Sequence, residues 1–254
     1  MNDTNVLVVH QPHLLPWPGY FNKLAAADIF VVQDNVQFRR RYFQNRTKIT
    51  IGDECRWLTV PVHATRHSRV REVRLVTGWR HNFLETIRHA YHRTEHFDAL
   101  FPTLESAISC SCNSLLDLNL KLLKVCFDLL DISPDVRLAS EFPELTSASE
   151  TLANIAETVN ASHYLFGEGG GLAYHGKAIF QSRGIATVVQ DFRKPFQEAA
   201  LTSEATFNLS IIDWLFKLGT QETQRLVKDL WQPDLQGRTR DRWFAGLARL
   251  VERR

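Results

Sequence analysis

Two short apolar stretches near the N-terminus, joined by a segment with helical spacing, constrain the fold more than any other feature. Residues 6–10 and 29–33 are apolar almost throughout, and residues 19–27 place their apolar side chains on one helical face. Two buried strands joined by a helix form a βαβ unit, which requires a parallel sheet with helices on its faces. The sequence therefore predicts an α/β fold.

A second βαβ unit is predicted in the C-terminal half. A capped helix from Ser147 to Asn160 precedes a strand at 162–166, a glycine-rich loop, a helix at 174–183 and a strand at 185–190. Together, the two units predict a three-layer, nucleotide-binding-like parallel sheet with a helical insertion.

The expected organisation is one compact domain built from four segments. Residues 1–78 form the first α/β half and 79–145 the helical insertion, whereas 146–219 form the second half and 220–254 a basic helical tail. Strands at 57–62 and 72–76 are expected to form a peripheral pair. Pro134 and Pro143 are expected to bracket a linker.

Composition places the protein among ordinary globular chains. The 254 residues carry a formal net charge of +2, and the four cysteines follow no disulfide pattern. The N-terminal apolar run is too short for a signal peptide or a membrane span, so a cytoplasmic location with reduced thiols is expected.

The candidate site lies where the first two strands end. His10 and Asp34 occupy the carboxyl ends of these strands, where parallel sheets bind ligands. Three prolines stiffen the loop 11–18, and its histidines exchange protons near neutral pH. The N-terminus of the next helix, near Gly19, suits an anion. The structural alternative is a rigid turn around a packed Trp17.

Several blocks of sequence resemble the WbqC-like protein family. They are residues 10–23 (HQPHLLPWPGYFNK), 27–30, 34–38 (DNVQF), 44–46, 57–62, 164–174 and 208–216. Members of this bacterial family occur in O-antigen and other surface-polysaccharide clusters. The resemblance implies transfer of glycine or a related aminoacyl group to a sugar.

The leading hypothesis is an acyl or aminoacyl transferase acting on an amino or hydroxyl acceptor, such as a nucleotide-linked sugar. His10 is the candidate base, and Asp34 the residue that orients His10 or the acceptor. Lys48 and neighbouring arginines are candidates for holding phosphates, although such a cluster is also typical of a solvated surface. The predicted substrate-binding residues are Gln11, His13, Trp17, Gly19, Tyr20, Asn35, Gln37, Arg39, Arg41, Asn45, Arg46, Glu168, Gly169, Gly170 and Tyr174.

Two other functions fit the same residues. A paired-histidine loop after the first strand resembles the layout of nucleotidylyltransferases such as pantothenate synthetase, which favours an ATP-dependent enzyme. The other is a non-catalytic nucleotide-sugar-binding protein. The co-substrate is left open between ATP with Mg²⁺ and an aminoacyl-tRNA. No metal site is expected, because the stripe formed by Glu85, His89, His92 and His96 lies opposite an apolar helical face.

Overall fold

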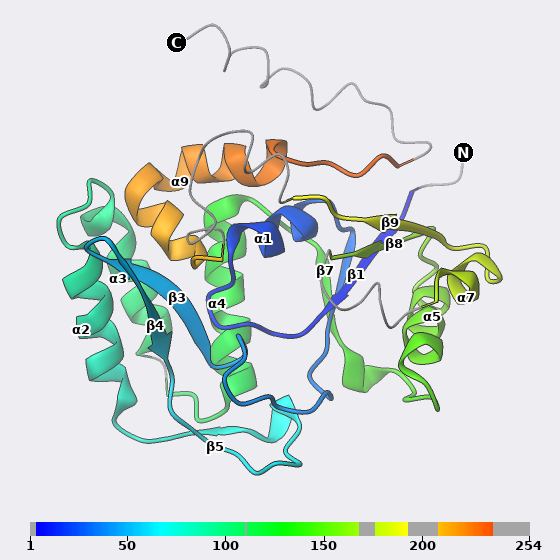
Figure 1. Cartoon of the computed structure of the whole chain (residues 1–254), viewed down its shortest axis with the longest axis horizontal. Helices are drawn as coiled ribbons and strands as arrows, with labels where there is room; N and C mark the ends of the chain where they lie inside the picture. The colour runs from blue at the N-terminus through cyan, green and yellow to red at the C-terminus, as the bar shows by residue number, and fades with distance from the viewer. Residues whose placement is uncertain (1–3, 110, 168–175, 193–207, 236–254) are drawn as a thin grey trace, which may run out of the picture.

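The computed structural model describes residues 4–109, 111–167, 176–192 and 208–235 (Figure 1). Five parallel strands form the main sheet in the order β7-β2-β1-β8-β9. They are β1 (Val6–His10), β2 (Ile29–Val32), β7 (Asp135–Leu138), β8 (His163–Phe166) and β9 (Ala186–Val189). The predicted α/β class with a parallel sheet is confirmed.

Helices cover both faces of this sheet because alternate residues of its central strands point in opposite directions. Val6 and Val8 of β1 belong to a core shared with α1 (Pro18–Ala25), α4 (Leu115–Leu130) and α9 (Ile211–Asp229). Leu7 and Val9 belong to a second core, shared with α5 (Ala148–Thr158) and α7 (Lys177–Gln181). The result is the predicted three-layer arrangement (Figure 1).

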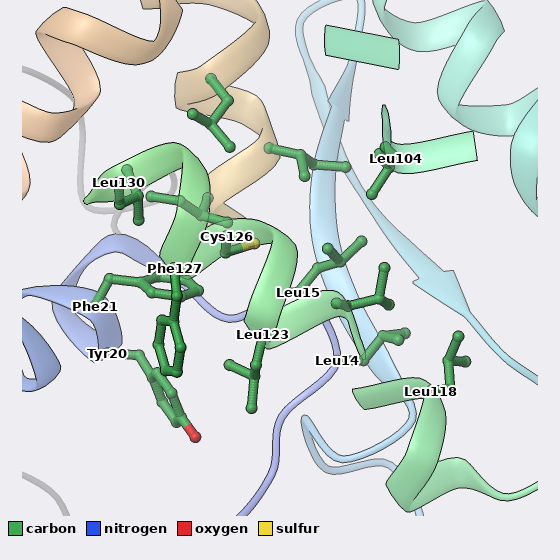
Figure 2. Packing of buried hydrophobic residues seen from close by; sticks show 14 of the residues in the cluster. Leu14, Leu15, Tyr20, Phe21, Leu104, Leu118, Leu123, Cys126, Phe127 and Leu130 are labelled. Atoms are coloured by element: carbon green, nitrogen blue, oxygen red, sulfur yellow. The ribbon is translucent and has the colours of Figure 1, made fainter. Parts of the chain in front are cut away.

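The helix α4 lies at the centre of the larger core, as its nearly continuous apolar surface predicts. Figure 2 shows Leu123 and Phe127 of this helix among side chains of the first loop and of α1. Leu14 and Leu15 of that loop are almost fully buried in the same cluster. The loop is therefore anchored by its leucines, while its histidines remain near the sheet edge.

A large insertion separates β2 from β7. It contains an antiparallel hairpin, a two-stranded ribbon with a short 3-10 turn, and two helices that precede α4. These elements are β3 (Arg46–Ile51) with β4 (Glu54–Thr59), β5 (Val62–His63) with β6 (Arg74–Leu75), the turn Val70–Glu72, α2 (Trp79–Tyr91) and α3 (Phe97–Ile108). A further 3-10 turn, Ala139–Glu141, follows β7.

The structure corrects two predictions about this insertion. The predicted strands 57–62 and 72–76 pair only at Val62 and Leu75, because residues 54–59 pair with β3, which the sequence interpretation treated only as a basic cluster. The predicted linker between Pro134 and Pro143 contains β7, so the segment 79–145 is not purely helical. Charged and polar residues interrupt the apolar ones in β3 and in β7, and Val136 of β7 is 43% exposed, so neither strand shows a buried-strand pattern.

Three members of the predicted stripe lie on the solvent side, as predicted, since Glu85, His89 and His92 are exposed. The fourth, His96, precedes α3 and is half-buried. Within the described ranges, no group of three or more histidine, cysteine or acidic residues is placed to hold a metal ion. A membrane-spanning helix is likewise absent from the part of the chain that the structure describes.

Candidate functional site

The order in which strands are added to the sheet reverses between β1 and β8. The strands β2 and β7 lie on one side of β1, whereas β8 and β9 lie on the other. Numbered along the chain, the strands lie in the order third, second, first, fourth, fifth, which is that of doubly wound nucleotide-binding folds. The connection after β1 leads to α1 on one face, whereas the connection after β8 leads to α7 on the other. In doubly wound folds, ligands bind at the carboxyl ends of the strands at such a switch point, and we call this place at the ends of β1 and β8 the β1–β8 crevice.

His10 ends β1 at this crevice and is held as a neutral imidazole. Its Nδ1 lies 3.0 Å from the carbonyl oxygen of Gln11, and because a carbonyl only accepts, Nδ1 carries the proton. The pKa of His10 lies well below its ordinary value because burial disfavours the charged ring, and nearby Lys23 and His13 add to this. The unprotonated Nε2 is thus available as a base.

His13 is the second histidine of the cluster and is 4% exposed. Its ring centroid lies 4.9 Å from that of His10, and the ring stacks on Phe43 at 5.6 Å. Neither ring nitrogen has a hydrogen-bond partner among the described residues. Burial lowers the pKa of His13 to about 3, so the ring is neutral. A buried polar group without a partner costs stability, which is typical of a functional position.

Lys23 brings a positive charge to the same crevice. It is 3% exposed, and burial lowers the pKa of its ammonium to about 7. No described carboxylate forms an ion pair with it. A Cβ built on Gly167, directly after β8, would lie 3.4 Å from its Nζ, so the amine lies beside the end of β8. An anionic ligand would supply the missing countercharge.

Sequence reasoning did not single out Lys23, although a signal was present. Lys23 lies three residues after Tyr20, which belongs to the apolar face of the predicted helix. A lysine on the buried face of a short helix is unusual, since lysine is rarely buried without a partner. The position therefore pointed to a functional residue.

Buried amides hold the loop that carries the histidines. The Nε2 atom of Gln44 donates to Oε1 of Gln11 at 2.9 Å, and Nδ2 of Asn119 donates to the carbonyl oxygens of Pro12 and Gln44. Asn45 donates to the carbonyl oxygen of Val60 at 2.8 Å. The side chains of Gln11 and Asn45, predicted to bind substrate, thus make contacts that fix the loop itself.

The N-terminus of α1 is covered by an aromatic ring. A Cβ on Gly19 would lie 2.2 Å from the ring of Trp17, so only glycine fits beneath the indole. Trp17 contacts Phe192 edge to face at 5.7 Å between ring centroids, and Gln190 donates to the carbonyl oxygen of Gly19 at 2.8 Å. Trp17 and Gly19 therefore support the structure, as the rigid-turn alternative predicts. The hydroxyl of Tyr20 donates to the carbonyl oxygen of Gln11 at 3.0 Å.

Residues after β2 lie on the neighbouring part of the sheet edge. Asp34 is 1% exposed, and its Oδ1 accepts a hydrogen bond from the backbone N–H of Ser140 at 2.9 Å. Among the described residues it makes no hydrogen bond to His10, so the predicted orienting contact is replaced by one that ties β2 to the segment after β7. Asn35 and Gln37 line a separate pocket at this edge.

The predicted basic residues lie farther out, before and on the hairpin β3–β4. Arg39 and Arg41 are exposed. The guanidinium of Arg46 stacks 3.8 Å above the ring of Trp57, which is itself 41% exposed. Ring contacts run from Trp57 through Phe43 to His13, linking this surface to the histidines. The predicted residues Glu168, Gly169, Gly170 and Tyr174 lie outside the described residues.

Comparison with known proteins places this arrangement in a family. The model of the WbqC-like protein family matches residues 11–225. The chain belongs to the WbqC-like protein family. The range matched in this WbqC-like chain includes the histidine loop, α1 and most of α9.

Similarity to a curated protein extends over most of both chains. The WbqC-like chain is 25% identical over 219 residues to the "Uncharacterized protein Rv1507c" of Mycobacterium tuberculosis (strain ATCC 25618 / H37Rv). The match covers 85% of this chain and 94% of that protein. No solved structure matches the chain significantly.

Proposed function

We propose that this protein is a transferase that moves an acyl or aminoacyl group onto an amino or hydroxyl acceptor bound at the β1–β8 crevice. The observation that carries the proposal is the neutral His10, with its unprotonated Nε2, beside a buried Lys23 that has no described acidic partner. A base next to an unpaired cation suits a reaction that removes a proton and handles an anion.

The chemistry assigns one step to each group. His10 Nε2 accepts the proton from the acceptor amine or hydroxyl as that atom attacks the carbonyl carbon of the donor. The carbonyl oxygen gains negative charge, the bond to the leaving group breaks, and the leaving group departs with the bonding electron pair. Lys23 stabilises negative charge in the crevice, either on a substrate phosphate or on the developing oxyanion.

The cellular role that we propose is modification of a sugar in surface-polysaccharide or specialised-metabolite assembly, in the cytoplasm. Support comes from the resemblance of the sequence blocks to a family found in such gene clusters. A nucleotide-linked amino sugar is the acceptor that we favour. An activated glycine is the donor that we would test first.

A second candidate function is ATP-dependent nucleotidylyl transfer. The strand order and the 4.9 Å spacing of the His10 and His13 rings favour it, because paired histidines after the first strand of a doubly wound sheet suit nucleotide phosphates. This function requires ATP and Mg²⁺ and predicts exchange of pyrophosphate into ATP. Acyl transfer from an aminoacyl-tRNA predicts neither.

The test is a transfer assay with mass-spectrometric detection of acylated product. Donors are glycyl-tRNA, acetyl-coenzyme A, and glycine with ATP and Mg²⁺; acceptors are uridine- and thymidine-diphosphate amino sugars. We expect His10→Gln to lower the transfer rate at least about 100-fold, the usual effect of removing a catalytic base. The matched control is His89→Gln, since His89 is exposed on α2.

Each outcome separates the candidates. Transfer that His10→Gln leaves unchanged contradicts the role of His10. Pyrophosphate exchange without acyl transfer replaces the proposal with nucleotidylyl transfer. Tight binding of a nucleotide sugar that both wild type and His10→Gln retain, without any product, supports the non-catalytic alternative.

A further inference from the structure

A second hollow lies at the same sheet edge, beyond β2 and β7. We call it the β2–β7 pocket. It has a volume of about 530 Å³, within the range of small-molecule sites. Its lining comes from the residues after β2, the turn after β7 and the first turns of α5. The β2–β7 pocket is therefore distinct from the crevice between β1 and β8.

The lining combines an apolar wall with amides that have no partner. Leu152 and Ile155 of α5 are buried and form part of the wall. The side-chain amides of Gln33 and Asn35 line the pocket and make no hydrogen bond with any other described residue. An apolar wall plus amide donors and acceptors that no described residue uses suits a heterocyclic base with its sugar.

The charges near the pocket are balanced, which argues against a phosphate in this position. Arg69 lines the pocket and pairs with Glu144 at 2.8 Å. Lys23, which has no acidic partner among the described residues, lies in the crevice instead. A ligand that uses both places would hold a neutral ring in the pocket and an anionic group beside Lys23.

The sheet sets the separation of the two places. The pocket lies over the ends of β7 and β2, and the crevice over the ends of β1 and β8. Across the strands, two spacings of about 4.8 Å amount to about 10 Å. The pocket wall from α5 and the helix α1 that carries Lys23 lie on opposite faces of the sheet, so a nucleotide that reaches both crosses the carboxyl edge of the sheet.

The strand order supports the same orientation of such a ligand, with its base over β2 and β7 and its phosphate over β1 and β8. In doubly wound folds of this order, phosphates lie after the first strand, and the residue at the end of the second strand contacts the ribose. Asp34 is engaged with Ser140 here, but the adjacent Asn35 amide faces the pocket without a described partner. Asn35 is thus placed to contact the sugar.

We propose that the β2–β7 pocket binds the base and ribose of a nucleotide whose phosphate reaches Lys23. This inference deepens the proposed function, on which it rests, by naming the substrate class as a nucleoside phosphate and by giving its base a site. Ala148 lines the pocket at the exposed start of α5 and is the position from which the inference is best tested.

The experiment compares uridine and adenosine monophosphates with ribose 5-phosphate by calorimetric titration. Ribose 5-phosphate keeps the sugar and phosphate but lacks the base. Wild type should bind one of the nucleotides at least tenfold more tightly than ribose 5-phosphate. Ala148→Trp fills the pocket and should remove that advantage, whereas Ala148→Ser is the matched control and should retain it. Lys23→Met should weaken every phosphate ligand.

Crosslinking gives a second readout that needs no variant. Photoactivated 8-azido-adenosine monophosphate or 5-azido-uridine monophosphate should label peptides that contain residues 33–37 or 144–155. Labelling elsewhere overturns the inference. So does nucleotide binding that is no tighter than that of ribose 5-phosphate, or that Ala148→Trp leaves unchanged.

The experiments distinguish failure of the pocket assignment from failure of the proposed transferase function. Acyl transfer that depends on His10 but uses an acceptor without a nucleotide would overturn the pocket assignment and leave the transferase intact. Conversely, nucleotide binding in the pocket without transfer would support the pocket and count against the transferase.

Discussion

Two buried polar clusters of this protein differ in how completely their groups are paired. Asp213 at the start of α9 is 4% exposed and accepts hydrogen bonds from the hydroxyls of Thr50 and Tyr91, the latter at 2.8 Å. Its other oxygen pairs with Lys217 at 3.0 Å. In the crevice, by contrast, both nitrogens of His13 lack a described partner.

The first cluster has a structural role, whereas the second is the one that we propose binds a ligand. The acid in the first cluster is satisfied from α2, β3 and α9, so the cluster joins these elements. Lys23 and His13 instead are buried without a described partner, which costs stability. Groups kept at such a cost point to a ligand.

The largest expected effect is the loss of stability when the fully paired cluster around Asp213 is disrupted. Asp213→Ala leaves the buried hydroxyl of Tyr91 without its acceptor and Lys217 without its ion-pair partner, and should lower the free energy of unfolding by about 3 kcal/mol. Urea unfolding measures this. Asp128→Ala, which removes an exposed pair with Lys124, is the control and should cost less than about 1 kcal/mol. Equal losses in both variants would contradict the structural role of Asp213.

Lowering the pH should destabilise the folded protein through His13, which is buried without a described hydrogen-bond partner. Its pKa is about 3 in the folded chain and near 6.5 when unfolded, so only the unfolded state gains the proton as pH falls below 6.5. Between pH 7 and pH 5 the free energy of unfolding should therefore fall by about 2 kcal/mol from this residue. His13→Leu should flatten the pH profile, and exposed His89→Leu should leave it unchanged. An unaltered slope in His13→Leu would show that His13 is not buried neutral.

Removing the unpaired cation should stabilise the protein. Lys23→Met eliminates a buried ammonium without a described partner and should raise the free energy of unfolding at pH 7 by about 1 kcal/mol or more. The gain should shrink as pH rises above 7, since Lys23 then becomes neutral in the folded state. Lys121→Met, at an exposed position on α4, is the control. Destabilisation by Lys23→Met would indicate a structural role.

The smallest effect concerns the basic surface on the hairpin. Arg46→Ala removes a guanidinium from the exposed ring of Trp57 and should cost about 0.5 kcal/mol in thermal unfolding. Binding of nucleoside monophosphates should remain unchanged. A tenfold loss of that binding would instead join Arg46 to the site, as the sequence interpretation predicted.

The sequence predicts the centre of this fold well because its strands are uniformly apolar. The segments β1, α1 and β2 follow from their periodicity, and the position of His10 at a strand end follows from them. At the sheet edge, β7 escapes prediction because Arg137 and the exposed Val136 make it look like a loop. Lys23 escapes because a lysine is normally exposed; its place three residues after Tyr20 was the available signal, and the packing of α1 shows that it is buried.

The contacts of the first loop also set an order of assembly during synthesis. Ser210 donates to the carbonyl oxygen of Leu15 at 2.8 Å, and Asn22 donates to those of Val227 and Trp231. The loop and α1 are translated early, but their partners leave the ribosome roughly 200 residues later. Ribosome-bound chains that end before α9 would hold the histidine loop without its support, so the last helix of the described residues completes a loop that is made near the start of synthesis.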